Sequence, residues 1–326
     1  MKIIINRRPD TLAIIGNGFD LNHGYDTLYS SFAKANEGSP ALAIFESYCG
    51  KELPGRTWYD FENNIRDLTE KLFLQSYDEE HDYEENRKRV KELKGAFTEI
   101  HTLLKEYLKN ETSSKPLIKK DCIRRYLNSR AVAVNFNYTD TAEAYTDKVI
   151  YVHGSLKEND ILLGYDYRDE ACLAEYEDMR WYKEFERESL AFRRALHKCS
   201  FITPESKIYN DLTEALESYQ IWDNSGRGLE EEAPDFMPYY RLIDRFVTRY
   251  RKHRDIPKVD YNRIKTLAVI GHGVGADRVY LGKILSKCVN LKKVVIYRHE
   301  KESDSEFKER AEFFRAYCDK IFYIKY

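Results

Sequence analysis

The sequence predicts an α/β protein built on a mostly parallel β-sheet. Short, nearly continuous apolar runs rich in β-branched residues recur along the chain, which is typical of strands covered on both faces. Long charged segments with apolar residues at helical spacing lie between these runs. The runs are found at Leu12–Ile15, Ala131–Val134, Val149–Val152, Leu267–Ile270, Val294–Tyr297 and Ile321–Ile324.

The last third of the chain shows a clean alternation of strand and helix patterns. Strands are expected at 266–270, 293–297 and 320–325, with helices at 278–288 and 303–318 between them. Such a βαβαβ succession joins parallel strands through right-handed crossovers. We therefore expect the C-terminal strands to belong to an open parallel sheet.

The helical segments are long enough to be insertions into one domain that spans residues 1–326. More than 100 mostly helical residues separate the first two strands, so insertions are expected at about 40–128 and 168–260. The patterns that predict helices lie at Trp58–Tyr77, Glu84–Asn110, Met179–Cys199 and Tyr239–His253. Trp58 and Phe61 are three residues apart and are expected to pack one helix face into a core.

Composition and charge narrow the class of protein. The chain has 53 Lys and Arg residues against 55 Asp and Glu residues, a net charge of −2, which argues against nucleic acid as a partner. No apolar run approaches the roughly 18 residues of a membrane span, so a cytoplasmic protein is expected. The cysteines at 49, 122, 172, 199, 288 and 318 form no CxxC pair. They indicate reduced, buried thiols, and no metal is expected.

Glycine turns follow two of the predicted strands. Gly16-Asn17-Gly18, before Phe19 and Asp20, follows the first strand, where glycines let a backbone approach a pyrophosphate. The turn that begins at Gly271-His272 leads into a helix near Asp277 and would hold a phosphate or ribose. For both turns the alternative is local geometry alone. Asp20 and Asp277 would then serve as caps or turn residues.

Polar residues follow two further strands. Asn135, Asn137, Tyr138 and Thr139 lie at the end of the second strand, where ligands bind in open α/β sheets. The alternative for the two amides is an Asx turn. His153-Gly154 follows the next strand, and an imidazole there suits proton transfer near neutral pH. A structural histidine is the alternative, but pairing with Asn137 favours a functional role.

In combination, these residues resemble the AbiH family of phage abortive-infection proteins. The resemblance spans residues 13 to about 285, and the sequence departs from it at Gly273, where the family more usually has Ser. The matching positions are Gly16 to Leu21, Gly24, Thr27 to Tyr29, Phe32, Trp58, Asp60 to Glu62, Asn135 to Thr139, His153-Gly154, Gly164, Gly271-His272 and Asp277.

AbiH-like proteins in turn resemble the SIR2-like superfamily, which binds NAD on a Rossmann-like sheet. That resemblance implies NAD as substrate or ligand and hydrolysis of its nicotinamide glycosidic bond. It gives catalytic roles to His153, Asn137 and Asp20. Nucleotide contacts would come from Gly16, Asn17, Gly18, Phe19, Asn135, Tyr138, Thr139, Gly154, Gly271, His272 and Asp277. Thr139 stands where many SIR2-like proteins have Asp. The four-cysteine zinc module of deacylating sirtuins is absent, so deacylation is not implied.

Three other functions stay open at this point. The chain can be a nucleotide-binding sensor or scaffold without catalysis, or a structural α/β interaction protein. A nuclease would need carboxylates such as Asp60 and Glu62, but residues two apart on a helix point in different directions. Besides a small nucleotide, two further partners are considered. These are a phage-derived trigger and further copies of the same chain in a homo-oligomer.

Overall fold

The computed structural model describes residues 9–49, 58–59, 61–65, 67–68, 83–157, 160–161, 163, 259–275 and 277–325. The chain divides into two compact units. The first unit comprises residues 1–38, 100–162 and 256–326, and the second comprises residues 39–99 and 163–255. The single domain with helical insertions at about 40–128 and 168–260 stays a prediction, because residues 164–258 lie outside those described.

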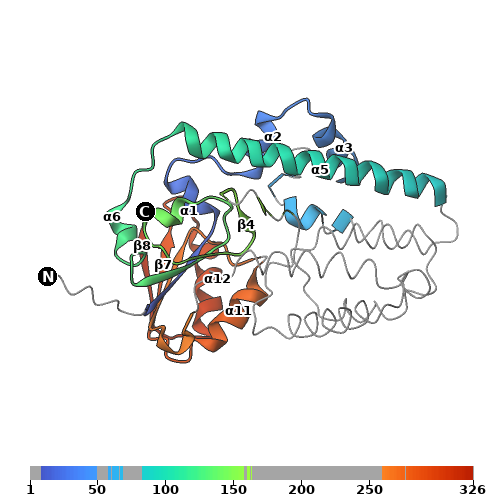
Figure 1. Ribbon diagram of the computed structural model, residues 1–326. Helices are drawn as coiled ribbons and strands as arrows, with labels where there is room; N and C mark the ends of the chain where they lie inside the picture. The colour runs from blue at the N-terminus through green and yellow to red at the C-terminus, as the bar shows by residue number, and fades with distance from the viewer. Residues whose placement is uncertain are drawn as a thin grey trace, which may run out of the picture. The chain divides into compact units, whose positions relative to one another are not determined.

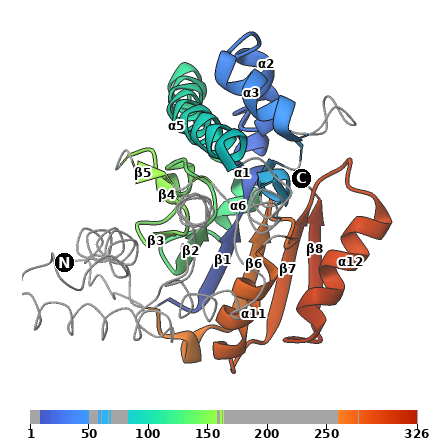
Figure 2. The same cartoon turned by 90° about the vertical axis from the view of Figure 1, so that its right-hand side faces the viewer.

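The first unit is built on a six-stranded sheet in which all neighbouring strands are parallel (Figure 2). This confirms the expected α/β fold, and each strand falls on one of the six apolar runs. The strand order across the sheet is β3-β2-β1-β6-β7-β8. The strands are β1 (Thr11–Ile15), β2 (Ala131–Asn135), β3 (Val149–Tyr151), β6 (Thr266–Ile270), β7 (Lys293–Arg298) and β8 (Ile321–Lys325).

The strand order contains a reversal between β1 and β6. From β1 the chain adds β2 and β3 on one side, and it then returns to add β6, β7 and β8 on the other. This is the order of Rossmann-like sheets, whose ligands bind outside the carboxyl ends of the strands at the reversal. The register puts Ile15 level with both Asn135 and Ile270. The three loops that follow these strands therefore start at the same height.

Helices cover both faces of the sheet. On one face, Phe19, Ile123 and Tyr145 join the sheet side chains in a fully packed apolar cluster. They come from or directly follow α1 (Asn17–Asn22), α6 (Asp121–Arg124) and the 3₁₀ turn Thr141–Ala144. Figure 2 shows α11 (Arg278–Lys287) and α12 (Asp304–Arg315) in front of the sheet and α6 behind it.

Several short elements complete the first unit. The hairpin of β4 (Gly154–Ser155) and β5 (Asp160–Ile161) was not predicted, because strands of two residues carry no periodic signal. Helix α2 (Tyr29–Ala35) follows α1, and a 3₁₀ turn at Tyr261–Arg263 precedes β6. Helix α12 begins with a capping box between Ser303 and Glu306, which fixes its first turn.

Within the described ranges the longest helix is α5 (Tyr83–Ser114), which confirms the helical pattern at 84–110 (Figure 1). Its residues from 100 onward belong to the first unit, where Ile100, Leu104 and Leu108 form a buried stripe at a spacing of four. Near its end the hydroxyl of Tyr107 donates to the carbonyl of Asp26 at 2.6 Å. This part of α5 is thereby tied to the loop after α1.

The second unit contains helix α3 (Pro40–Cys49) and an aromatic cluster. Trp58 and Phe61 are buried and stacked, with ring centroids 5.0 Å apart, and both contact Phe45. Their expected packing role is thus confirmed. Residues 61–65 and 67–68 are helical, but residues 58–59 form a turn, so the helix does not begin at Trp58 as expected. The remaining residues of the expected helix at 58–77 and the expected helices at 179–199 and 239–253 lie outside the described residues.

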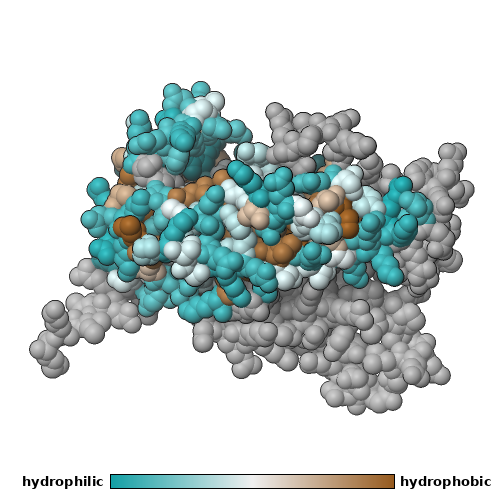
Figure 3. Space-filling view, turned by 90° about the horizontal axis from the view of Figure 1, so that it is seen from above, coloured by the Kyte–Doolittle hydropathy of each residue, from teal (hydrophilic) through white to brown (hydrophobic). Residues whose placement is uncertain are grey.

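The hydropathy of the surface and the burial of the cysteines agree with most of what the composition predicts. On the face seen in Figure 3 the described residues are mainly hydrophilic, with apolar atoms in small separate groups. No helix among the described residues is long and apolar enough to cross a membrane. Of the described cysteines, all of which are free thiols, Cys288 and Cys318 are buried and Cys49 is half-buried. Cys122 is exposed, contrary to the expectation that the thiols are buried.

Candidate functional site

Four polar side chains that are nearly fully buried lie beyond the carboxyl ends of β1, β2, β3 and β6. The exposed fractions are 1% for Asp20, 7% for Asn137, 4% for His153 and 5% for His272. Burying polar groups costs free energy unless they are hydrogen-bonded or paired, so their contacts decide what the cluster is for.

The glycines of the first turn allow the loops after β1 and β6 to touch backbone to backbone. A Cβ on Gly16 would lie 2.7 Å from the Cα of His272, and one on Gly18 would lie 2.8 Å from the Cα of Gly271. The N–H groups of Gly16 and Gly18 donate to the carbonyls of Ile270 and Gly271, at 3.1 and 2.9 Å. These two N–H groups are therefore already used within the protein, and close loop packing accounts for both glycines.

The other two predicted residues of this turn differ in exposure. Asn17 is exposed, and its side-chain oxygen accepts a hydrogen bond from the hydroxyl of Thr27. Phe19 is completely buried, and its ring packs against those of His23 and Tyr145. The side chain of Phe19 is therefore part of the core.

His23 is a buried residue that the motif analysis missed. Its Nδ1 lies 2.7 Å from the carbonyl oxygen of Phe19, and its Nε2 lies 2.7 Å from the hydroxyl of Tyr145. That hydroxyl also accepts from the backbone N–H of Lys120, at 2.7 Å. The pattern assigns a neutral ring with the proton on Nδ1. Burial lowers the pKa of His23, in agreement with a neutral ring.

Asp20 lies inside α1, whose N-cap is Gly16, so it is not a capping residue. Its Oδ2 accepts from the hydroxyl of Thr139 at 2.7 Å, and Thr141 donates to Thr139 in turn. Its Oδ1 is buried and accepts no hydrogen bond from the part of the chain that is described. Burial raises the pKa of Asp20 from 3.8 to about 6, although the polar side chains of Thr139, Thr141 and Asn137 nearby lower it.

Asp20 makes a specific contribution to the pH dependence of stability. Because its folded-state pKa is raised, its protonation stabilises the fold at low pH, and this stabilisation is lost as the pH rises through about 6. The full shift of this pKa corresponds to about 3 kcal/mol of unfolding free energy, and roughly half of this contribution is present at pH 5. We expect Asp20→Asn to remove this component. Urea unfolding of both proteins between pH 5 and 8 measures it as a difference.

The matched control for this measurement is Asp121→Asn, because the side chain of Asp121 is 95% exposed. Comparing variant with wild type also cancels the contribution of His23. That residue acts in the opposite direction, because its lowered pKa makes stability fall below about pH 6.5. Parallel pH profiles of wild type and Asp20→Asn would show that Asp20 does not titrate in this range.

The loop after β2 contains two asparagines with different roles. The side-chain oxygen of Asn135 accepts from the N–H of Asn137 at 3.1 Å, and its amide donates to the carbonyl of Thr139 at 3.0 Å. Asn135 therefore closes the strand as an Asx turn. Asn137 instead donates its side-chain amide to the carbonyl of Gly16, at 3.0 Å. This bond ties the β2 loop to the β1 loop.

His153 follows β3 by two residues and is enclosed by aromatic rings. Its ring centroid lies 5.6 Å from that of Phe136 and 6.4 Å from that of Tyr138, which is itself buried. Its Nε2 lies 3.8 Å from Oδ1 of Asp277. Gly154 has φ +80°, the left-handed region that favours glycine, and starts the short strand β4.

The loop after β6 holds a second histidine against Asp277. Nε2 of His272 lies 3.1 Å from Oδ2 of Asp277, and Nδ1 accepts from the N–H of Val274 at 3.0 Å. Val274 has φ +72°, an outlier for a β-branched residue of the kind that clusters at functional sites. By contrast, a Cβ on Gly273 or Gly275 would meet nothing within 4 Å. These two exposed glycines present bare backbone.

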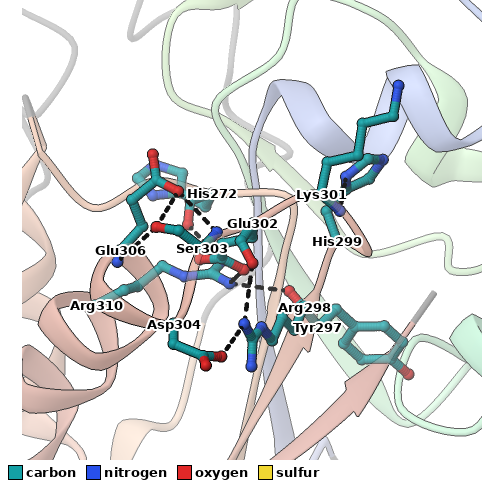
Figure 4. Close-up of polar contacts among 10 residues, drawn as sticks. All are labelled: His272, Tyr297, Arg298, His299, Lys301, Glu302, Ser303, Asp304, Glu306 and Arg310. Carbon is teal, nitrogen blue, oxygen red and sulfur yellow. Dashed lines mark hydrogen bonds and ion pairs between the residues drawn. The ribbon is translucent and has the colours of Figure 1, made fainter.

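Arg310 on α12 donates a hydrogen bond to the loop after β6, and the sequence did not point to it (Figure 4). It is only 8% exposed, and it donates to the carbonyls of His272 and Tyr297 at 3.1 and 3.2 Å. It also donates to Oε2 of Glu302 at 2.6 Å. The one available signal was an arginine on the same helix face as Ala311 and Phe314, which are buried.

Three of the matched positions lie outside the described residues of the first unit. Asp60 and Gly164 lie outside the described residues, and Glu62 is half-buried in the second unit. Among the described residues there is no group of three or more His, Cys, Asp or Glu side chains that could hold a metal ion. The nuclease alternative stays a prediction, because Asp60 of its carboxylate pair lies outside the described residues.

The fold and this cluster define the class: a Rossmann-like α/β protein with buried histidine, aspartate and asparagine side chains at the reversal of its sheet. A family model described as bacteriophage abortive infection AbiH matches residues 12–299. The protein therefore belongs to the AbiH family, as the motif resemblance predicted, and its role lies in phage abortive infection. No match was found among curated proteins or among solved structures.

Proposed function

We propose that this AbiH protein binds NAD at the sheet reversal and hydrolyses its nicotinamide glycosidic bond. The observation that carries the proposal is the meeting of Asp20, Asn137 and the His153–Asp277–His272 group at the carboxyl ends of the strands. Sheets of this strand order bind nucleotides at that position. The reaction consumes NAD and water and releases nicotinamide, ADP-ribose and a proton.

The nucleotide phosphates fit the second glycine turn better than the first. In the first turn Gly16 and Gly18 already donate their N–H groups to the β6 loop. Gly273 and Gly275 are exposed, and a Cβ on either would meet no atom of the described residues within 4 Å. Backbone N–H groups in such turns bind anions. We therefore assign the phosphates to residues 273–275.

The chemistry needs positioning and charge stabilisation more than covalent catalysis. Cleavage builds positive charge on the ribose, and Asp20 is mostly ionised at neutral pH because its pKa is about 6. Its Oδ1, which accepts no hydrogen bond from the described residues, would face that charge. His153 would take a proton from water or a ribose hydroxyl, and Asn137 would orient that group.

The direct test is an NAD-consumption assay on purified protein with extract of phage-infected cells present as trigger. We expect nicotinamide and ADP-ribose to form in equal amounts, and His153→Ala to lower the rate at least about 100-fold. The matched control is His299→Ala, because His299 is exposed on the loop after β7. Equal NAD consumption by wild type and His153→Ala would refute the catalytic assignment.

A second candidate is a nucleotide-binding sensor without catalysis. The low exposure of the three assigned side chains favours it, since none of them exceeds 7%. Calorimetry with NAD and with ADP-ribose separates the two functions. Tight binding of either nucleotide, with no turnover even in the presence of infected-cell extract, would identify the sensor.

A further inference from the structure

We propose that Asp277 is a positioning residue that fixes the tautomer of His153, while His272 holds the carboxylate of Asp277 in place. The inference rests on the proposed function only for the reaction that His153 would serve. The tautomers themselves follow from contacts within the first unit. They make Nδ1 of His153 the nitrogen that accepts a proton.

Asp277 occupies the N-cap of α11 without using its side chain as a cap. No side-chain capping hydrogen bond is formed at this position. Instead its two carboxylate oxygens face two histidines, with Oδ2 at 3.1 Å from His272 and Oδ1 at 3.8 Å from His153. An aspartate at an N-cap ordinarily accepts a hydrogen bond from the helix N-terminus, so its orientation here calls for another explanation.

The tautomer of His272 follows from its backbone contact. The N–H of Val274 is a donor, so Nδ1 of His272 must be an acceptor. The ring proton of neutral His272 is then on Nε2, which faces Asp277. The loop is held in this conformation by Arg310, which donates to the carbonyl of His272. His272 is thus a fixed donor that orients the carboxylate.

The second carboxylate oxygen then determines the state of His153. An ionised carboxylate can only accept, so the ring nitrogen that faces it carries the proton, and this nitrogen is Nε2. The distance of 3.8 Å is longer than a hydrogen bond, and such catalytic contacts commonly tighten when substrate binds. The aromatic rings of Phe136 and Tyr138 also lie close to the His153 ring.

The experiment is ¹⁵N NMR of the histidine rings in wild type, Asp277→Asn and Asp319→Asn at a pH where the rings are neutral. In wild type we expect the proton on Nε2 of both His153 and His272. In Asp277→Asn the amide oxygen still accepts from His272, but the amide NH₂ now faces His153. We therefore expect His153 to shift its proton to Nδ1 while His272 stays unchanged. Asp319 is exposed, so its variant controls for the substitution.

The result is independent of whether NAD is the substrate. A proton on Nδ1 of either ring in wild type, or an unchanged His153 in Asp277→Asn, overturns the proposal even if NAD is consumed. If Asp277→Asn does not fold, the wild-type spectrum alone decides. Where NAD is turned over, Asp277→Asn is expected to lower kcat by about 100- to 10,000-fold with little change in KM, as for a wrong tautomer.

Discussion

Replacing Gly271 with alanine is expected to cost more than about 4 kcal/mol of folding free energy and to abolish stable folding of the first unit. Gly271 has φ +66°, and a Cβ there would lie 2.1 Å from the backbone nitrogen of Phe19 and 2.4 Å from the carbonyl carbon of Gly18. Neither atom can move aside as a flexible side chain would, because both belong to the backbone of the first turn of α1. Circular dichroism during denaturant unfolding measures the loss.

Gly273→Ala is the matched control, two residues further along the same loop. A Cβ at Gly273 meets nothing within 4 Å, and its backbone is outside the left-handed region. We expect its stability to stay within about 1 kcal/mol of wild type. Similar stabilities for Gly271→Ala and Gly273→Ala would show that the β1 and β6 loops are not in direct contact.

Arg310→Met is expected to lower the free energy of unfolding by about 3–5 kcal/mol, because it removes one partner of a buried ion pair. The side chain of Glu302 is 15% exposed and would be left with an unpaired charge. The carbonyls of His272 and Tyr297 would also lose their donor. Urea unfolding monitored by fluorescence gives the difference between variant and wild type.

Two further variants make this prediction specific. Arg315→Met lies on the same helix, but its ion pair with Glu312 is exposed, so less than about 1 kcal/mol should be lost. Adding Glu302→Gln to Arg310→Met removes the unpaired charge and should restore part of the stability. If the double variant is no more stable than Arg310→Met, the loss comes from the backbone contacts and not from the buried charge.

All six strands of the sheet could be predicted because they form continuous apolar runs. The inner strands β1, β2, β6 and β7 are mostly buried, whereas the edge strand β3 is half-buried and the edge strand β8 exposes Phe322 and Tyr323. The order of the strands could not be predicted, since pairing of β1 with β6 depends on which strand edges meet and not on any local pattern. The contacts of Arg310 with His272 and of His23 with Tyr145 were missed for the same reason. Each joins residues far apart in the sequence, by 38 and 122 positions.

In the candidate site, the sequence predicts which residue types are present but not the separate role of each residue. The motifs identified Asn135 and Asn137 together, and both are asparagines at the end of one strand. Only the hydrogen bonds distinguish them, because Asn135 closes its own loop and Asn137 reaches the carbonyl of Gly16. Asp277 was expected as a cap and sits at the capping position, but its carboxylate faces two histidines.

The direct contact between the Gly16–Gly18 turn and Gly271 has a consequence for synthesis of the protein. More than 250 residues separate these segments in the sequence, so a ribosome must synthesise all of them before the two segments can meet. Until then β1 has one open edge, and neither His272 nor Asp277 can reach His153. A nascent chain that has not yet reached residues 271–277 therefore lacks the assembled site, and the site forms only after these residues have been synthesised.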